Sequence, residues 1–219
     1  MKNKYYFLLL FILTSTTVFA QQIETKFIFD EFKQGKLVNK RGDTYQALFN
    51  YDIINQRLMF ISAADSTILE IAEPNEVSYI NIDGRIFEHI KGTSFYERMN
   101  IGDCVFYIQW EAKYMSKGKK GAYGTTSHTS AVGSIGMIEN QGGQFLKLTT
   151  AEDFEVKSEN LYYLKMKNNL KRFYSADSLA KLFKGHEEDI KEYVKKNNLD
   201  FNNLENIKAV VEYCSQYLK

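Results

Sequence analysis

The 219-residue sequence contains few of the residues that usually form metal sites, catalytic sites or disulfide bonds, with two cysteines and three histidines, and it has one proline. Two cysteines are too few for a disulfide framework, so the fold has to be held by its hydrophobic core. The cysteines and histidines have no metal-ligand spacing, and the sequence has none of the Gly-rich phosphate-binding motifs or the Gly-x-Ser-x-Gly nucleophile motif. We therefore expect no metal, no cofactor and no catalytic residue set.

Charge of either sign is also not in excess, with 28 basic and 27 acidic residues. A balanced chain has no electrostatic footprint for nucleic acid or for an anionic membrane, so we expect neither as a partner. After the first 20 residues no apolar run reaches the roughly 18 residues of a membrane-spanning helix, so we expect no transmembrane segment in the mature chain.

The first 20 residues have the organisation of an export signal. Lys2 and Lys4 precede the apolar run 5–13 (YYFLLLFIL), and Val18-Phe19-Ala20 resembles a cleavage site. The mature chain is predicted to begin at Gln21 and to be soluble in the periplasm or outside the cell. An uncleaved N-terminal anchor is the alternative. No cysteine follows the apolar run, so no lipid anchor is expected.

Residues 21–174 are predicted to form an antiparallel β-domain. About eight short strand-like segments follow one another between residues 35 and 114, separated by turn signals such as Asp83-Gly84. No helix-length segment divides them, which favours a meander in a sandwich, a barrel or a bent sheet. A further hairpin is expected at 161–166 and 170–174, around Asn168-Asn169.

The segment 103–114 (DCVFYIQWEAKY) is predicted to be one long, half-buried strand. Its residues alternate between an apolar face, which includes the only tryptophan, and a more polar face. The apolar face consists of Cys104, Phe106, Ile108, Trp110 and Ala112. The other face consists of Val105, Tyr107, Gln109, Glu111 and Lys113.

Residues 175–219 change to the helical period and are predicted to form two or three helices packed on the β-domain. Ser175 is expected to cap a helix over 176–184 that ends at Gly185. A second helix is expected at about 187–196, and Asn202 with Glu205 resembles a capping box for a third. The predicted fold class is therefore α+β, with the strands first and the helices after them.

This order of an export signal, the hairpin GKLVNKRGDTYQALFNYD, a meander, GKKGAYG, and the helical end LAKLFKGHEEDIKEYVKKNNLDFNNLENIKAVVEYC resembles uncharacterised exported proteins common in Bacteroidota. The resemblance covers most of the mature chain. It implies export and the β-then-α order. No known activity is attached to these proteins, so it implies no catalytic residue.

The candidate contact surface is the polar face of the long strand together with the region 113–128 that follows it. Residues 115–143 are rich in Gly, Ser and Thr, and a loop of this length in a compact domain is either functional or disordered. Lysines among glycines suit an anion, and exposed tyrosines suit a peptide or a carbohydrate, whereas a solvated basic loop and half-buried sheet tyrosines predict the same residues. The candidate residues are Lys113, Tyr114, Lys117, Lys119, Lys120, Tyr123 and His128.

These observations favour a non-enzymatic exported module of the cell envelope that binds an envelope protein or a glycan. The alternatives are a hydrolase acting on envelope or dietary polymers, whose acid and base would have to converge from distant strands, and a purely structural role. Cys104 and Cys214 are either a disulfide or two small buried hydrophobic residues.

Overall fold

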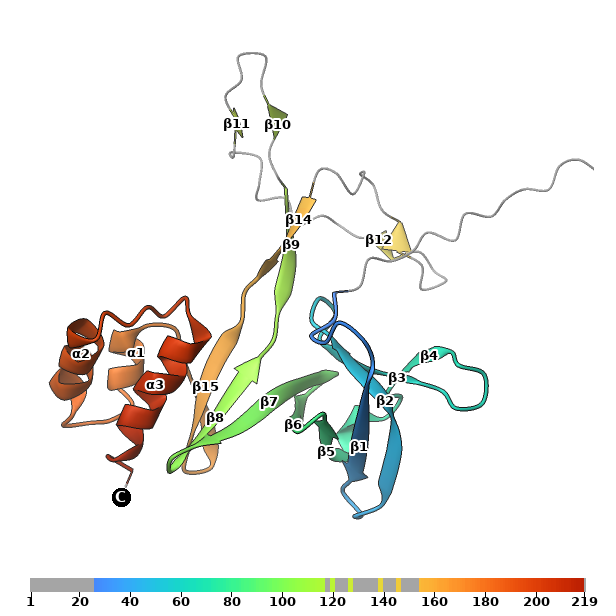
Figure 1. Ribbon diagram of the computed structural model, residues 1–219, viewed down its shortest axis with the longest axis horizontal. Coiled ribbons are helices and arrows are strands. Elements are labelled where there is room, and N and C mark those ends of the chain that lie inside the picture. The colour runs from blue at the N-terminus through green and yellow to red at the C-terminus, as the bar shows by residue number, and fades with distance from the viewer. Residues whose placement is uncertain are drawn as a thin grey trace, which may run out of the picture.

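The computed structural model describes residues 26–116 and 154–218, together with four two-residue strands between those ranges. The described residues form an antiparallel meander in a ten-stranded sheet, followed by three helices (Figure 1). The predicted α+β class and the order of its parts are confirmed. The leader, Lys117, Tyr123 and His128 lie outside the described residues.

The main sheet has the strand order β16-β15-β8-β7-β6-β5-β1-β2-β3-β4. Its strands are β1 (Lys33–Asn39), β2 (Thr44–Asp52), β3 (Arg57–Ile61), β4 (Ile68–Glu70), β5 (Val77–Ile82), β6 (Arg85–Lys91), β7 (Ser94–Ile101), β8 (Cys104–Gln109), β15 (Leu161–Met166) and β16 (Asn169–Phe173). A short 3-10 helix, η1 (Pro74–Glu76), precedes β5. Three two-stranded pairs complete the strands: β9 (Ala112–Ser116) with β14 (Phe154–Ser158), β10 (Lys119–Lys120) with β11 (Thr126–Ser127), and β12 (Ile138–Glu139) with β13 (Phe145–Leu146).

Local turn chemistry determines the hairpins. Asp83 and Gly84 both have positive φ, at 50° and 84°, as a type I′ turn between β5 and β6 requires. The later hairpin turns one residue earlier than predicted. Met166 pairs with Asn169, so the two turn residues are Lys167, at φ 56°, and Asn168.

The first half of the sheet bends around an N-terminal core. Side-chain hydrogen bonds, rather than pairing between strands, link the β2–β3 turn to β7 and β8 across this core. Gln56, in the β2–β3 turn, accepts hydrogen bonds from Ser94 and from Gln109, the latter at 2.7 Å. The backbone N–H of Ala112 also bonds to the carbonyl of Ile53 in that turn, at 3.1 Å. The buried residues of this core are Leu37, Phe49, Tyr51, Ile53, Leu58, Val77, Ile80, Ile82, Phe87, Phe95 and Ala112.

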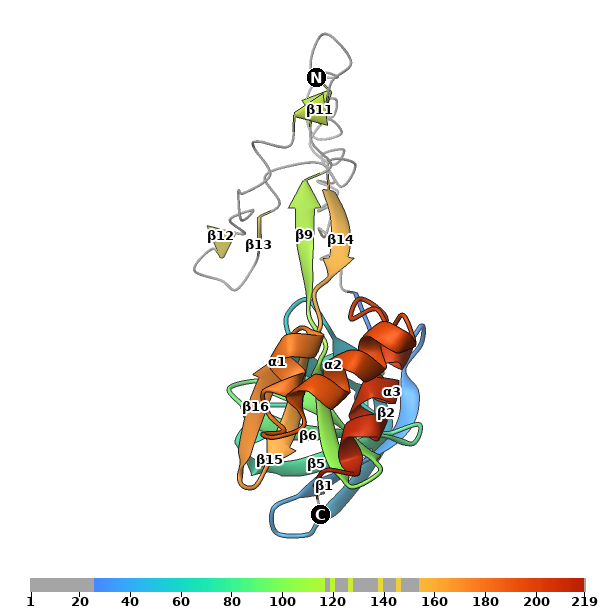
Figure 2. The same cartoon turned by 90° about the vertical axis from the view of Figure 1, so that its left-hand side faces the viewer.

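The helices α1 (Ala176–Ala180), α2 (Glu187–Lys196) and α3 (Leu204–Ser215) cover the other end of the sheet and form a second, helical core (Figure 2). α3 lies against β8 and β7. The buried residues of the helical core are Cys104, Phe106, Ile108, Leu164, Phe173, Leu179, Ala180, Phe183, Ile190, Ile207, Val210, Val211 and Cys214.

The helix boundaries follow their caps. Ser175 caps α1 in a reciprocal capping box with Ser178, as its hydroxyl accepts from the Ser178 N–H, but α1 ends at Ala180 and so is shorter than predicted. α2 has the predicted bounds. The cap of α3 is Asn203 rather than Asn202, because the Asn203 side chain accepts from the N–H groups of Glu205 and Asn206.

The long strand predicted for 103–114 is broken after Gln109. β8 belongs to the main sheet, whereas β9 leaves it and pairs with β14. Trp110, between them, packs against both cores. The break is fixed by distant segments, because the backbone N–H groups of Glu111 and Ala112 bond to the Asn160 side chain and the Ile53 carbonyl instead of to a sheet neighbour.

The two edges of the main sheet differ. β16 exposes Lys171 and Arg172, and charged residues on an edge discourage pairing with another chain. β4, at the opposite edge, exposes Ile68 (52%) and Leu69 (44%). Within the described part of the chain, none of the helices is long and apolar enough to cross a membrane.

Candidate binding surface

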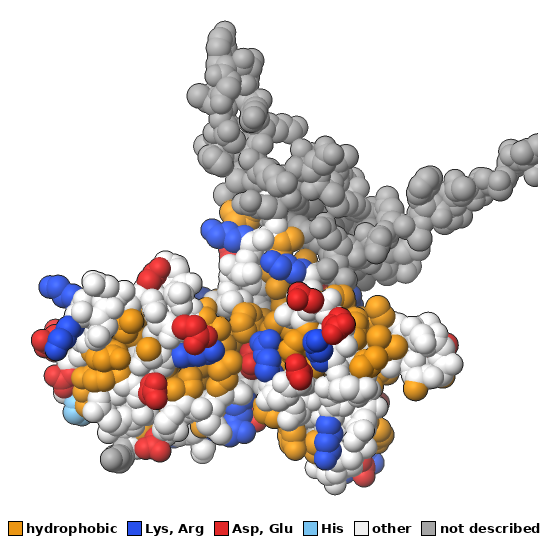
Figure 3. All heavy atoms as spheres, viewed as in Figure 1, with side chains coloured by type: hydrophobic (Ala, Val, Ile, Leu, Met, Phe, Trp, Pro, Cys, Tyr) orange, Lys and Arg blue, Asp and Glu red, His pale blue; other side chains and the backbone are white. Residues whose placement is uncertain are grey.

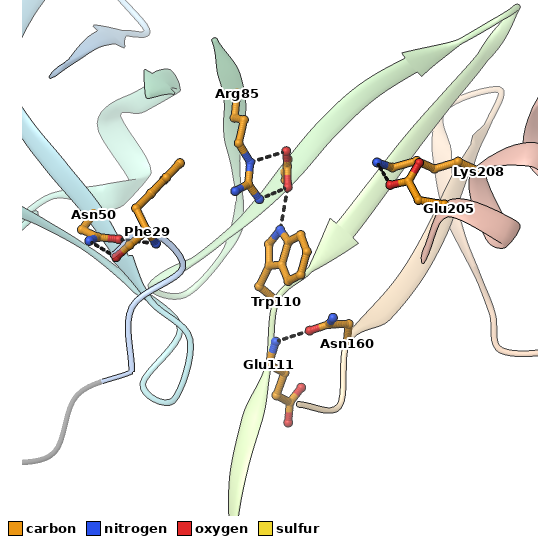
Figure 4. A network of polar contacts seen from close by, with 9 residues as sticks. Phe29, Asn50, Arg85, Trp110, Glu111, Asn160, Glu205 and Lys208 are labelled. Carbon is orange, nitrogen blue, oxygen red and sulfur yellow. Dashed lines mark hydrogen bonds and ion pairs between the residues drawn. The ribbon is translucent and has the colours of Figure 1, made fainter. Parts of the chain in front are cut away.

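A buried charge pair lies where the two cores meet. The Glu97 carboxylate, which is 2% exposed, accepts two hydrogen bonds from the Arg85 guanidinium, at 2.7 and 2.6 Å, and a third from the Trp110 indole N–H at 2.6 Å (Figure 4). The guanidinium also lies 4.9–5.5 Å from the ring centres of Phe29, Phe87 and Trp110. Glu97 is therefore neutralised and hydrogen-bonded, which is an arrangement for a structural carboxylate rather than for an acid or base free to act on a substrate.

Two shallow recesses flank Arg85. One, of about 370 Å³, is lined by the start of β6 and the second half of β7, including Arg85, Glu97 and Met99. The other, of about 390 Å³, lies against residues 28–33 of the N-terminal segment, including Phe29. The Phe29 ring, which lines the second recess, lies 4.9 Å from the guanidinium, and the Arg85 side chain is 30% exposed.

The polar face of β8 is buried rather than presented to solvent. Tyr107 is 3% exposed and Gln109 is 6% exposed. The Tyr107 hydroxyl donates to Glu88 at 2.7 Å, and the Gln109 amide bonds both to Gln56 and to the Tyr163 hydroxyl. Tyr107 is thus bound to β6 and Gln109 to the β2–β3 turn, so neither side chain lines an open groove.

The strands β9 and β14 form a ribbon that projects away from the body of the protein (Figures 1 and 2). Lys113 stands directly opposite Lys157 in its register, so both lysines lie on one face, and both are exposed. Ala112 and Val156 lie on the other face and pack into the N-terminal core. The ribbon is thus amphipathic at its base, with its lysine face turned to solvent.

The base of the ribbon is closed by contacts between its own two strands, and the bond from the Ala112 N–H to the Ile53 carbonyl joins it to the body. The N–H of Glu159 bonds to the carbonyl of Glu111 at 2.7 Å, and the Lys113 ammonium lies 2.7 Å from the Glu159 carboxylate and 3.6 Å from that of Glu111. The Lys113 hydrogen bond lowers the pKa of Glu159, and Glu159 in turn raises the pKa of Lys113. Both groups are therefore charged at neutral pH.

Of the seven predicted contact residues, the structure describes the side chain of Lys113 only. Tyr114 lies in β9, and Lys119 and Lys120 form β10, but their side chains are not among those described. The prediction missed Lys157 and Glu159. The alternation of Phe154 and Val156 with Glu155 and Lys157 was the available signal for a strand there.

The histidines of the described region have ordinary structural roles. The Nε2 atom of His89 lies 2.9 Å from the carbonyl of Gly92, and the ring of His186 stacks on Tyr217 with centroids 4.0 Å apart. No group of three or more His, Cys, Asp or Glu residues suited to a metal ion occurs in the described parts of the chain. Acidic and basic side chains are interspersed over the face seen in Figure 3, as the balanced charge of the sequence leads one to expect.

Comparison with protein-family models, with curated proteins and with solved structures finds no match to this chain. Its function is therefore inferred from its own residues.

Proposed function

We propose that this chain is an exported, non-enzymatic binding module of the cell envelope, and that it engages a partner protein through the β9–β14 ribbon. The observation that carries the proposal is the projecting ribbon with Lys113 and Lys157 side by side on its solvent face. Within the described residues each strand of the ribbon pairs only with the other, so each outer edge offers backbone groups to an added strand.

The fixed base supports this role. A ribbon anchored to the N-terminal core by Ala112 and Val156, with its two strands joined by the Lys113–Glu159 pair, loses little conformational freedom when a partner binds, which favours affinity. The paired lysines favour a partner segment with acidic side chains, because complementary charge raises the association rate and the specificity. A protein segment fits this surface better than a glycan, because it supplies both a strand and carboxylates.

A single charge reversal tests the ribbon. We expect Lys157→Glu to weaken capture of an envelope protein by about tenfold, with a loss that shrinks as salt is raised. The matched control is Lys165→Glu, an exposed lysine of β15 in the body, which should leave capture unchanged. Binding is measured by titrating immobilised protein against solubilised envelope.

Equal capture by wild type and Lys157→Glu would refute the ribbon as the contact surface. Captured material that survives protease but not glycosidase would mean that the partner is a glycan.

Export is tested separately. The full chain produced in a Gram-negative host should be recovered in the periplasm or the medium. Its mass should be that of a chain beginning at Gln21. Variant chains in which Leu8 to Leu10 are replaced by charged residues should stay in the cytoplasm. Unprocessed wild-type chain in the cytoplasm would contradict the proposal.

A further inference from the structure

Both cysteines of the chain lie at the contact between α3 and β8. Cys104 opens β8 and Cys214 lies in the last turn of α3, and both are free, buried thiols of the helical core. The Cys104 sulfur lies 3.6 Å from the carbonyl oxygen of Val211. Residues three apart share one side of a helix, so Cys214 follows Val211 along the face of α3 that meets Cys104.

A second close contact between the β7–β8 turn and α3 lies near the two cysteines. Gly102, in the β7–β8 turn at φ +55°, approaches α3 so closely that a Cβ atom there would lie 2.7 Å from the Cβ of Ser215. Gly102 is two residues before Cys104, and Ser215 directly follows Cys214. The end of α3 and the β7–β8 turn therefore approach each other closely beside the two thiols.

We propose that Cys104 and Cys214 form a disulfide bond when the chain folds in an oxidising compartment, joining α3 covalently to β8. This rests on the export that the proposed function includes, because such bonds persist outside the cytoplasm. In the reaction one thiolate attacks the disulfide of an oxidised thiol–disulfide oxidoreductase or of oxidised glutathione, and the second thiolate then displaces that carrier. One S–S bond forms, the thiols lose two protons and two electrons, and the carrier is reduced to its dithiol or thiol form.

The chemistry sets the order of events. Burial raises the pKa of Cys104 to about 11, and burial with the nearby Cys104 raises that of Cys214 to about 12. Only the thiolate is the nucleophile, so the folded, reduced protein reacts slowly at neutral pH. The bond therefore forms while the chain is still folding, before α3 closes over β8.

The test is refolding of the purified, reduced protein in a glutathione redox buffer, compared with refolding in reductant. After denaturation, the chain from the redox buffer should accept no maleimide label and lack two hydrogens in its intact mass, whereas the chain from reductant should accept two labels. The bond closes a loop of more than 100 residues, so the oxidised chain should melt about 10 °C higher.

The control is Cys104→Ala, which should take one label in either buffer and show no difference in melting temperature. Two labels on natively folded wild type from the redox buffer would overturn the proposal, and so would disulfide-linked dimers in place of the internal bond. This experiment does not depend on the compartment. A chain that forms the bond in the tube but stays in the cytoplasm of the cell would contradict export alone.

Discussion

At the scale of single residues, the pair formed by Arg85 and Glu97 holds the junction of the two cores. Arg85→Ala leaves the Glu97 carboxylate buried with only the Trp110 N–H as a donor, so we expect a loss of about 3 kcal/mol in the free energy of unfolding. Replacing both residues by Met and Leu removes the buried charge and should recover most of this loss. Urea denaturation measures both effects.

The comparison for Arg85 is Arg98, on the opposite face of the sheet. Its side chain is 37% exposed and its nearest carboxylate, that of Glu88, is 3.4 Å away. Arg98→Ala should cost less than about 1 kcal/mol, as exposed ion pairs contribute little. Equal losses for the two arginines would mean that the Glu97 carboxylate is not the cause.

At the scale of the element, α3 tests the position of a cap. Asn203→Ala removes the acceptor for two N–H groups and should destabilise the protein by about 1 kcal/mol. The neighbouring Asn202 bonds only within its own loop, to Asp200, so Asn202→Ala should change stability by a few tenths of a kcal/mol at most. Thermal denaturation measures both variants. A larger loss of stability for Asn202→Ala than for Asn203→Ala would mean that Asn202, the residue predicted from the sequence, is the cap.

What the sequence predicts well at this scale is local. The Asp83-Gly84 turn, the Ser175 cap and the bounds of α2 depend on residues within one turn of each other, and the structure has them all. The break between β8 and β9 was not predictable, because it depends on Ile53 and Asn160, which are both distant from it in the sequence. Alternation continues through Trp110 and Ala112 because Trp110 packs against both cores and Ala112 is buried in the N-terminal core.

The contact surface shows the same limit. Lys113 was a candidate from its place in the alternating strand, but its opposite residue, Lys157, is brought beside it only by the pairing of β9 with β14. Tyr107 and Gln109 read as a solvent face because they are polar. They are buried because other segments provide hydrogen-bond partners: Glu88 accepts from Tyr107, and Gln56 and Tyr163 bond to Gln109.

At the scale of the whole molecule, the buried tyrosines predict a loss of stability in alkali. Burial raises the pKa values of Tyr51, Tyr96 and Tyr107 well above the ordinary value of 10.0, and burial also raises the pKa values of both cysteines. The unfolded chain releases these protons near pH 10 while the native chain keeps them. Their contribution is therefore complete at neutral pH and is lost as the pH rises above about 10, by up to about 1.4 kcal/mol per pH unit for each tyrosine.

Urea unfolding at about pH 8 and about pH 10.5, in reductant, measures this slope. Tyr107→Phe should make the slope shallower. Tyr45→Phe, a change at a ring that is 57% exposed, should not. A free energy of unfolding that does not change over this range would show that the phenols ionise as readily in the folded protein as in the unfolded chain.

The unlike edges of the main sheet bear on how the protein behaves when it is concentrated. β16 carries Lys171 and Arg172, whereas β4 carries Ile68 and Leu69. Of the two edges of the main sheet, only β4 therefore favours pairing with a strand of another chain. In concentrated solution we expect light scattering to rise to the limited level of paired chains, Leu69→Lys to suppress this rise, and Lys171→Leu to make the scattering increase continuously with time. One permissive end favours paired chains, and opening the second end would turn pairs into filaments.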